Sequence, residues 1–202
     1  MLDHVLLDVI AAIRRAFDAA LLERQAVEER FQVDVFLGDL SWETSYSLPG
    51  EGSPPRVRAD LSLDWPTWSQ SAYRSWSIGE PAGDPPELVI EVALRIQRLA
   101  ELPDTAHVLA VLPPESPPLG RDTLERSGPT VEQVYAASGS APPQAAVEVS
   151  YQGTYRLDEA SLEDPGKMED HMSELGRWVA STLVRLGDLG LKYLPPEALD
   201  AG

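Results

Sequence analysis

Alternating apolar and polar residues occupy 31–65 in three consecutive runs, a pattern that predicts an antiparallel meander. The apolar members of each run share one face of a strand: Phe31, Val33, Val35 and Leu37, then Leu40, Trp42, Thr44, Tyr46 and Leu48, then Val57, Ala59, Leu61, Leu63 and Trp65. The parity of the alternation changes at Gly38-Asp39, as a two-residue type II′ hairpin requires. We therefore expect one face in the core and the other in water, with this pairing: Leu37 with Leu40, Val35 with Trp42, Val33 with Thr44 and Phe31 with Tyr46.

Two segments carry the apolar spacing of amphipathic helices. Asp3 can cap a helix over 3–29, and the meander that follows directly offers its apolar stripe a surface to cover. A second amphipathic helix is predicted over 165–187, after Asp164-Pro165 and before Gly190. Its stripe consists of Met168, Met172, Leu175, Val179, Leu183 and Leu186.

The segment 83–100 gives two conflicting signals. Asp84 is a good cap residue, two prolines follow it, and Glu87 stands three positions after it, which predicts a helix over about 85–100. Its stretch 87–94 is instead rich in β-branched residues, which favour a strand. The helix is therefore the prediction, and the strand over 87–94 is its alternative.

The remaining segments complete a mixed pattern. Residues 66–84 show no clear period and are interpreted as a continuing or edge strand, and 107–112 as a short buried strand. The Pro/Gly-rich span 113–145 is predicted to be mostly loop, with two helical turns over 130–137. A strand pair is expected around Gln152-Gly153, over 146–151 and 154–157. The predicted fold is therefore α+β, with one domain over 1–158 and a C-terminal helical extension over 159–202.

Charge and composition narrow the function classes. The 202-residue chain has a formal net charge of −17 and a pI near 4.4, which argues against binding to nucleic acid or to an anionic membrane. The absence of cysteine excludes a disulfide scaffold, a thiolate zinc site and a cysteine nucleophile. No run approaches the roughly 20 apolar residues of a membrane span, and the N-terminus lacks a signal-peptide pattern, so we expect a cytoplasmic protein.

No catalytic, cofactor-binding or metal-binding residue is predicted, and we expect a protein that is not an enzyme. The histidines at 4, 107 and 171 lie in separate elements without ligand spacing, and no P-loop, nucleophile elbow or dinucleotide fingerprint is present. Asp34 and Glu43 are expected opposite each other on the polar face of the hairpin. Such a pair is either a cation site or a repulsion relieved by a neighbour, and Arg56 and Arg58 on the next strand could neutralise it.

One catalytic alternative comes from the order of elements. A helix, three strands with an aspartate, and a Glu-x-Lys on another strand resemble restriction-endonuclease-like nucleases, with Asp60 and Glu91-Val92-Ala93 at the matching places. Ala93 stands where the lysine that assists the attacking water belongs, and Arg95 is a poor deprotonatable substitute. This alternative is therefore a degenerate nuclease fold without activity.

An aromatic cluster follows the meander, formed by Trp65, Trp68, Tyr73 and Trp76 among small polar residues. It either completes the core or forms an interface, because tryptophan and tyrosine are enriched in buried contacts between proteins. We assign these four residues as candidate interface residues.

The order of elements over 1–158 resembles the tail-terminator or cap proteins of contractile and long-tailed phage-like particles. The N-terminal helix, Pro54-Pro55 leading into Val57–Trp65, the predicted helix Glu87–Leu99, and Thr130–Ala137 followed by Ala146–Leu157 carry the resemblance. It implies a structural protein that forms a ring, as a hexamer, and docks on tail tube and sheath proteins within a contractile injection system. A third alternative is a small acidic chaperone or immunity-type protein that binds a basic partner.

Overall fold

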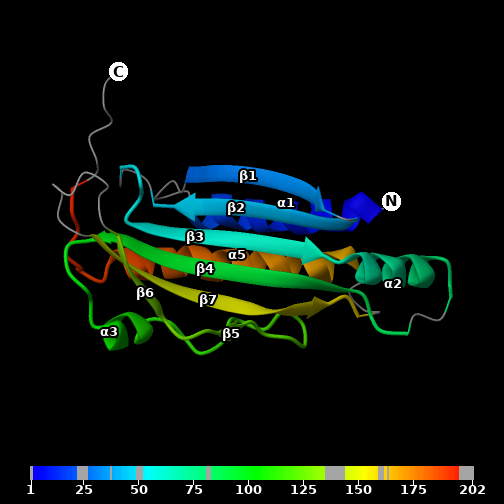
Figure 1. The fold of residues 1–202 in the computed structure, drawn as a ribbon. Coiled ribbons are helices and arrows are strands. Elements are labelled where there is room, and N and C mark those ends of the chain that lie inside the picture. The colour runs from blue at the N-terminus through cyan, green and yellow to red at the C-terminus, as the bar shows by residue number, and fades with distance from the viewer. Residues whose placement is uncertain are drawn as a thin grey trace, which may run out of the picture.

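The chain forms two layers, an antiparallel sheet with two long helices across one of its faces (Figure 1). This computed structural model describes residues 2–21, 27–36, 38–48, 52–80, 83–134, 144–158, 162 and 164–195. The strand order is β1-β2-β3-β4-β7-β5, and β6 also pairs with β7. The strands are β1 (Val27–Phe36), β2 (Asp39–Ser47), β3 (Val57–Trp65), β4 (Glu87–Leu99), β5 (Glu125–Arg126), β6 (Thr130–Val134) and β7 (Gln144–Arg156). The α+β fold class is therefore confirmed.

The helix layer is made by α1 (Leu2–Leu21) and α5 (Pro165–Gly187), which lie behind the sheet in Figure 1. The predicted bounds of α5 are confirmed, and Asp164 caps it by accepting the backbone N–H of Gly166. The N-terminal helix is shorter than predicted, because Val27–Glu29 already belong to β1 and 22–26 lie outside the described residues. No helix in the described ranges is long and apolar enough to span a membrane.

The meander is confirmed, but the predicted register of its first hairpin is wrong by two residues. Val35 pairs with Leu40 and Val33 with Trp42, while position 37 lies outside the described residues. Phe36 pairs with Asp39, so the loop ends at Gly38, whose φ of +93° suits glycine. A shift of two residues preserves the alternation along the strand, so the hydrophobic pattern cannot distinguish the two registers.

Asp39, the first residue of β2, anchors the hairpin to the segment that follows β3. Its carboxylate accepts the backbone N–H of Thr67 at 2.6 Å and the Thr67 hydroxyl at 2.7 Å, so Asp39 ties the hairpin to the next helix. These two hydrogen bonds stabilise the charged form and hold the pKa of Asp39 below its ordinary value. This contact joins residues 28 positions apart in the sequence, so turn rules do not predict it.

The predicted helix over 85–100 is wrong, and the strand alternative over 87–94 is confirmed by β4. Leu88, Ile90 and Val92 are buried, while the residues between them are not. β4 lies between β3 and β7 and is hydrogen-bonded on both sides, which outweighs the local helix-start pattern. The N–H of Glu87, which a helix start would leave to a cap, bonds to the hydroxyl of Ser69 at 2.7 Å.

Three further predicted elements are wrong. Residues 66–84 contain the helix α2 (Thr67–Ser77) rather than a strand, and 107–112 contain the end of α3 (Thr105–Leu109), which Asp104 caps. The predicted helical turns over 130–137 begin with β6, whereas 135–137 lie outside the described residues. A partner strand, β7, decides the case of β6, and local composition does not reveal it.

The predicted strand pair 146–157 is one continuous strand, β7, rather than a hairpin. Gly153 does not form a turn but pairs with Ile90 in the ladder. A Cβ atom at Gly153 would lie 2.8 Å from the backbone oxygen of Thr123. Glycine is therefore needed here because the segment around Thr123 packs closely against β7.

One apolar core joins the sheet to both helices. Ile13 of α1 and Leu183 of α5 are fully buried in the same cluster as Trp42 and Ile90 of the sheet. At Gly176 a Cβ atom would lie 2.7 Å from the Cβ of Ala16, so α1 and α5 cross with their backbones close together. The segment 159–202 thus supplies part of the core that the sheet needs.

Candidate functional site

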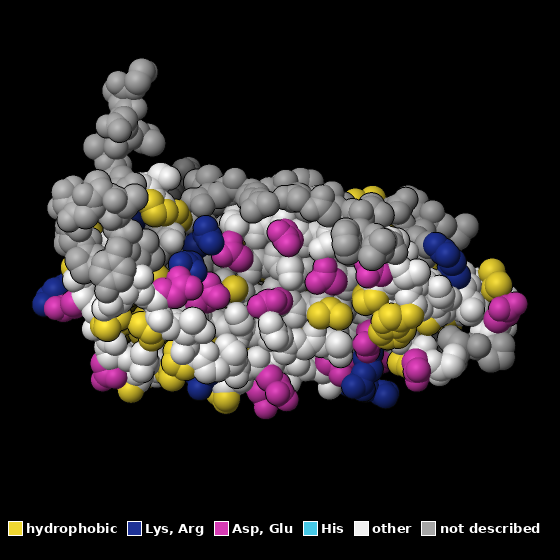
Figure 2. All heavy atoms as spheres, in the orientation of Figure 1, with side chains coloured by type: hydrophobic (Ala, Val, Ile, Leu, Met, Phe, Trp, Pro, Cys, Tyr) yellow, Lys and Arg dark blue, Asp and Glu magenta, His cyan; other side chains and the backbone are white. Residues whose placement is uncertain are grey.

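The face of the sheet opposite the helices carries the polar residues of each strand and is open within the described part of the chain (Figures 1 and 2). Acidic side chains are spread over this face in Figure 2. The register assigns to it Glu43, Asp60, Asp64, Glu87, Glu91, Glu132 and Glu148, against Arg58, Arg95 and Arg156. The open face is therefore predominantly acidic. A solvated sheet face needs only polar residues, so the acidic charge is not required by the fold.

The residues of the open face form rows that run across the strands. One row consists of Glu43, Ser62, Glu91 and Gln152, and the next consists of Ser45, Asp60, Ala93 and Ser150. The second row has only short side chains, and a hollow of about 310 Å³ opens there. Its lining includes Glu43, Ser45, Arg58, Asp60, Glu91 and Ala93. We call it the central hollow.

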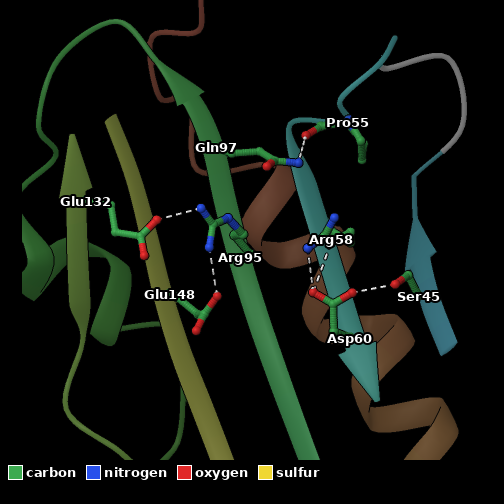
Figure 3. A network of polar contacts seen from close by, with 8 residues as sticks. All are labelled: Ser45, Pro55, Arg58, Asp60, Arg95, Gln97, Glu132 and Glu148. Atoms are coloured by element: carbon green, nitrogen blue, oxygen red, sulfur yellow. Dashed lines mark hydrogen bonds and ion pairs between the residues drawn. The ribbon is translucent and has the colours of Figure 1, made fainter. Parts of the chain in front are cut away.

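Asp60 on one wall of the central hollow is already hydrogen-bonded (Figure 3). Its Oδ2 accepts the Nε of Arg58 at 2.9 Å and lies 2.9 Å from an Nη of the same guanidinium. Its Oδ1 accepts the hydroxyl of Ser45, a residue of the neighbouring strand. Both carboxylate oxygens are therefore engaged, and Asp60 is a fixed part of the wall.

Arg95 lies in the row beyond the hollow and joins three strands. Its guanidinium contacts Glu132 of β6 at 2.6 Å and Glu148 of β7 at 3.0 Å (Figure 3). Partial burial lowers the pKa of Arg95, but the hydrogen bonds and charges of the two glutamates outweigh it, so the pKa is raised. Arg95 thus offsets part of the negative charge of the two glutamates on the β6 side of the open face.

Glu43 and Glu91 differ from these paired acids. Within the described part of the chain, neither carboxylate accepts a hydrogen bond or forms an ion pair. They flank Ser62 in one row, on strands two apart in the sheet, which places their backbones about 10 Å from each other. Two negative charges beside a hollow are suited to receive a cationic side chain.

Asp34 and Glu43 are not opposite each other, so that predicted pair is wrong. In the observed register Asp34 pairs with Ser41, and Glu43 pairs with Gln32. Of the two arginines expected to neutralise the pair, Arg58 instead binds Asp60 on its own strand, and Arg56 lies over the ring of Tyr193 at 5.0 Å.

The histidines remain separate in the structure. His107 lies in α3, and the Nδ1 of His171 is 3.0 Å from the hydroxyl of Tyr155, while the side chain of position 4 is outside the described set. No group of three or more acidic or histidine side chains in the described ranges is placed to hold a metal ion.

The candidate interface residues occupy the end of the sheet, where α2 extends beyond the strands (Figure 1). Trp65 is fully buried and donates its indole N–H to Ser69 at 3.1 Å, so it belongs to the core. Tyr73 packs edge-on against Trp65 and contacts Trp76, with ring centres 5.7 and 5.8 Å apart. Trp68 is 50% exposed, so its ring is the one most available to another protein.

Asp60, Glu91 and Ala93, the residues of the nuclease alternative, do come together. Asp60 is the register partner of Ala93, and Glu91 is two residues away on the same face. Sequence reasoning found these residues but missed the ion pairs of Arg95, because Glu132 lay in a predicted helix and no local signal connected β6 with β4.

The fold and site define a two-layer α+β protein with an open acidic sheet face. Comparison of the chain with protein-family models, with curated proteins and with solved structures finds no match.

Proposed function

We propose that this chain is a non-catalytic binding protein that holds a basic segment of a protein partner on the open face of its sheet. The observation that carries the proposal is the central hollow, beside which Glu43 and Glu91 have no partner within the described chain. A long basic side chain, such as that of arginine, fits between two such carboxylates and buries its stem against Ala93. The net charge of −17 adds long-range attraction for a basic partner.

The test measures binding of an extended peptide of alternating arginine and serine, which serves as a basic probe. Glu43→Gln combined with Glu91→Gln should weaken binding about tenfold, since each removes a contact worth about 0.5–1 kcal/mol. The matched control is Asp8→Asn with Asp170→Asn, which changes the net charge equally at two exposed positions of α1 and α5. The control should weaken binding less than twofold.

Two results would contradict this proposal. Equal loss in both double variants would mean that the peptide responds to net charge alone, without a defined site. Unchanged binding in the variant of Glu43 and Glu91 would mean that the central hollow takes no part. Calorimetry at physiological salt is the suitable measurement, because low salt exaggerates non-specific attraction.

The nuclease alternative is distinguished by a direct assay. Asp60 is held by Arg58 and Ser45, and Ala93 opposite it offers no base, so we expect no cleavage of DNA with magnesium or manganese. Metal-dependent cleavage that Asp60→Ala abolishes would establish the opposite.

A second candidate function is the ring-forming cap of a phage-tail-like tube. The exposed ring of Trp68, on a helix that extends beyond the sheet, favours this candidate, because aromatic anchors dominate interfaces between proteins. The ring would be a hexamer that docks on tube and sheath proteins and stops their polymerisation. Electron microscopy of particles from cells that lack the chain tests it: tubes of uncontrolled length without a terminal ring are expected, and uniform tubes with intact tips would refute it.

A further inference from the structure

Glu87 extends the unpaired acidic surface of the open face along β4 to the end of the sheet. It lies four residues before Glu91, on the same face of the same strand. Within the described part of the chain, its carboxylate accepts no hydrogen bond and forms no ion pair. Arg156, its register partner on β7, lies 3.7 Å from Asp122 instead. Glu87 is thus available to a partner, as Glu43 and Glu91 are.

Trp68 lies on the flank of α2 that faces β4. The hydroxyl of Ser69, the next residue, bonds to the N–H and C=O of Glu87 at 2.7 and 2.6 Å, so the first turn of α2 lies against the start of β4. Gln70 donates to the backbone oxygen of Gly38, in the hairpin on the other side of β3. Residues two apart in an α-helix point in nearly opposite directions, so Trp68 faces away from that hairpin and towards β4.

Apolar surface is exposed beside Glu87. Val89 lies between Glu87 and Glu91 on the open face and is 36% exposed, and Trp68 is 50% exposed. Figure 2 shows apolar side chains gathered on the open face near α2. No arginine or lysine among the described residues stacks on the ring of Trp68. We call Trp68, Glu87 and Val89 the terminal subsite.

The terminal subsite combines an aromatic face, a carboxylate and an aliphatic side chain, a set that suits arginine. A guanidinium can stack on an indole while it pairs with a carboxylate, and its aliphatic stem can cover Val89. A purely apolar side chain would instead remove water from Glu87 and Glu91 without supplying a counter-charge, which is unfavourable. The terminal subsite is therefore suited to a second basic side chain of the partner.

The spacing of the two sites along β4 determines which side chains of a partner reach both. Glu91 borders the central hollow and Glu87 belongs to the terminal subsite, so the sites lie four residues apart, about 13 Å. An extended segment that runs along β4 has the same rise per residue, and its alternate side chains face the sheet. Two side chains four residues apart therefore reach both sites, whereas a spacing of three or five turns one of them away.

We propose that the open face recognises an extended segment with two arginines four residues apart, Arg-x-x-x-Arg. One arginine enters the central hollow and the other the terminal subsite. This inference rests on the proposed function, because the central hollow is the first of its two sites. It adds a requirement for spacing, which attraction to the net charge of −17 does not impose.

Calorimetry with the full chain at physiological salt provides the test. Serine peptides of equal length carry two arginines three, four or five residues apart, so their charge and composition are identical. The peptide with a spacing of four should bind about tenfold more tightly than the other two, since only it gains both the indole and the carboxylate contact. A peptide with leucine in place of the second arginine should bind no better than a peptide with a single arginine.

Variants of the terminal subsite supply a second readout. Trp68→Ala and Glu87→Gln should each weaken the correctly spaced peptide about threefold and leave the single-arginine peptide unaffected. Trp68→Phe keeps an aromatic face and should retain most of the affinity. The matched controls are Ile78→Ala, which removes an exposed apolar side chain after α2, and Asp8→Asn, which removes an exposed carboxylate of α1. Neither control should change the preference for spacing.

The outcomes separate this inference from the proposed function. If spacing has no effect while Glu43→Gln with Glu91→Gln still weakens the single-arginine peptide, the terminal subsite is refuted and the proposed function stands. If no arginine peptide binds, both are refuted. Tighter binding of the leucine peptide would show an apolar subsite and would equally contradict the inference, as would an unchanged preference for spacing in Trp68→Ala and Glu87→Gln.

Discussion

Arg98 illustrates how a single residue holds distant segments in place. Its side chain is only 4% exposed, and its guanidinium donates to the backbone oxygens of Pro54 at 2.9 Å and Leu194 at 2.7 Å. Its backbone adopts φ +60°, a left-handed conformation that favours glycine. Two opposing effects therefore meet at this position, a favourable pair of hydrogen bonds and an unfavourable backbone.

These effects predict an unusual order of stabilities. Arg98→Ala should lower the free energy of unfolding by about 1–3 kcal/mol, because two part-buried hydrogen bonds from a charged donor are lost. Arg98→Gly loses the same hydrogen bonds but relieves the left-handed backbone, so it should be less destabilising than alanine by about 1 kcal/mol. Urea unfolding of the three proteins is the measurement. An alanine variant as stable as the glycine variant would show that the backbone strain is not significant.

The sequence predicts some features of the candidate site and not others. The sequence pattern places Asp60 and Ser62 correctly on the wet face of β3, because alternation assigns faces without knowledge of partners. It does not identify the central hollow. That hollow depends on short side chains from three strands falling in one row, and the row exists only once the register of β2, β3 and β4 is known.

At the scale of elements, the contact between α1 and α5 is set by one glycine. Gly176 lets the helices approach until its Cα faces Ile13 and Ala16, and a Cβ there would lie 3.2 Å from the backbone oxygen of Ile13. Glycine within a helix costs roughly 1 kcal/mol relative to alanine, so a close packing requirement must offset that cost.

A small-residue exchange tests this contact. Gly176→Ala should destabilise by about 1–3 kcal/mol despite its better helix propensity, because its methyl group meets that of Ala16. Ala16→Gly added to it should recover much of that loss by vacating the space. Denaturant midpoints of the single and double variants form the comparison. Additive destabilisation in the double variant would mean that the two positions do not touch.

The elements that sequence predicted correctly are those with a long, uninterrupted period and an exposed second face. The helix over 165–187 and the strand Val57–Trp65 meet both conditions. The outer face of β4 is only partly exposed, so its pattern is less clear. The residues that resemble a helix start also lie next to Ser69, whose hydroxyl bonds to both the N–H and the C=O of Glu87. Pairing with β3 and β7, together with this contact to α2, outweighs the local propensity that assigned β4 wrongly.

At the scale of the whole molecule, the sheet depends on α5. Met172, Leu175 and Val179 are fully buried within the common core, so a chain that lacks this helix exposes the apolar face of β3 and its neighbours. We expect a chain truncated after residue 158 to lose its cooperative thermal transition and to aggregate. Calorimetry and light scattering measure both effects. A soluble truncated chain with an unchanged transition would show that the sheet and α1 fold without α5.

The pairing of α1 with α5 has a consequence for biosynthesis. In the helix layer, α1 precedes all of the strands in the sequence and α5 follows all of them. During translation, α1 and the strands leave the ribosome while half of their cover has not yet been synthesised. The apolar face of the sheet therefore stays partly uncovered until α5 emerges from the ribosome. The nascent chain is most prone to aggregation, and most dependent on chaperones, just before α5 is released.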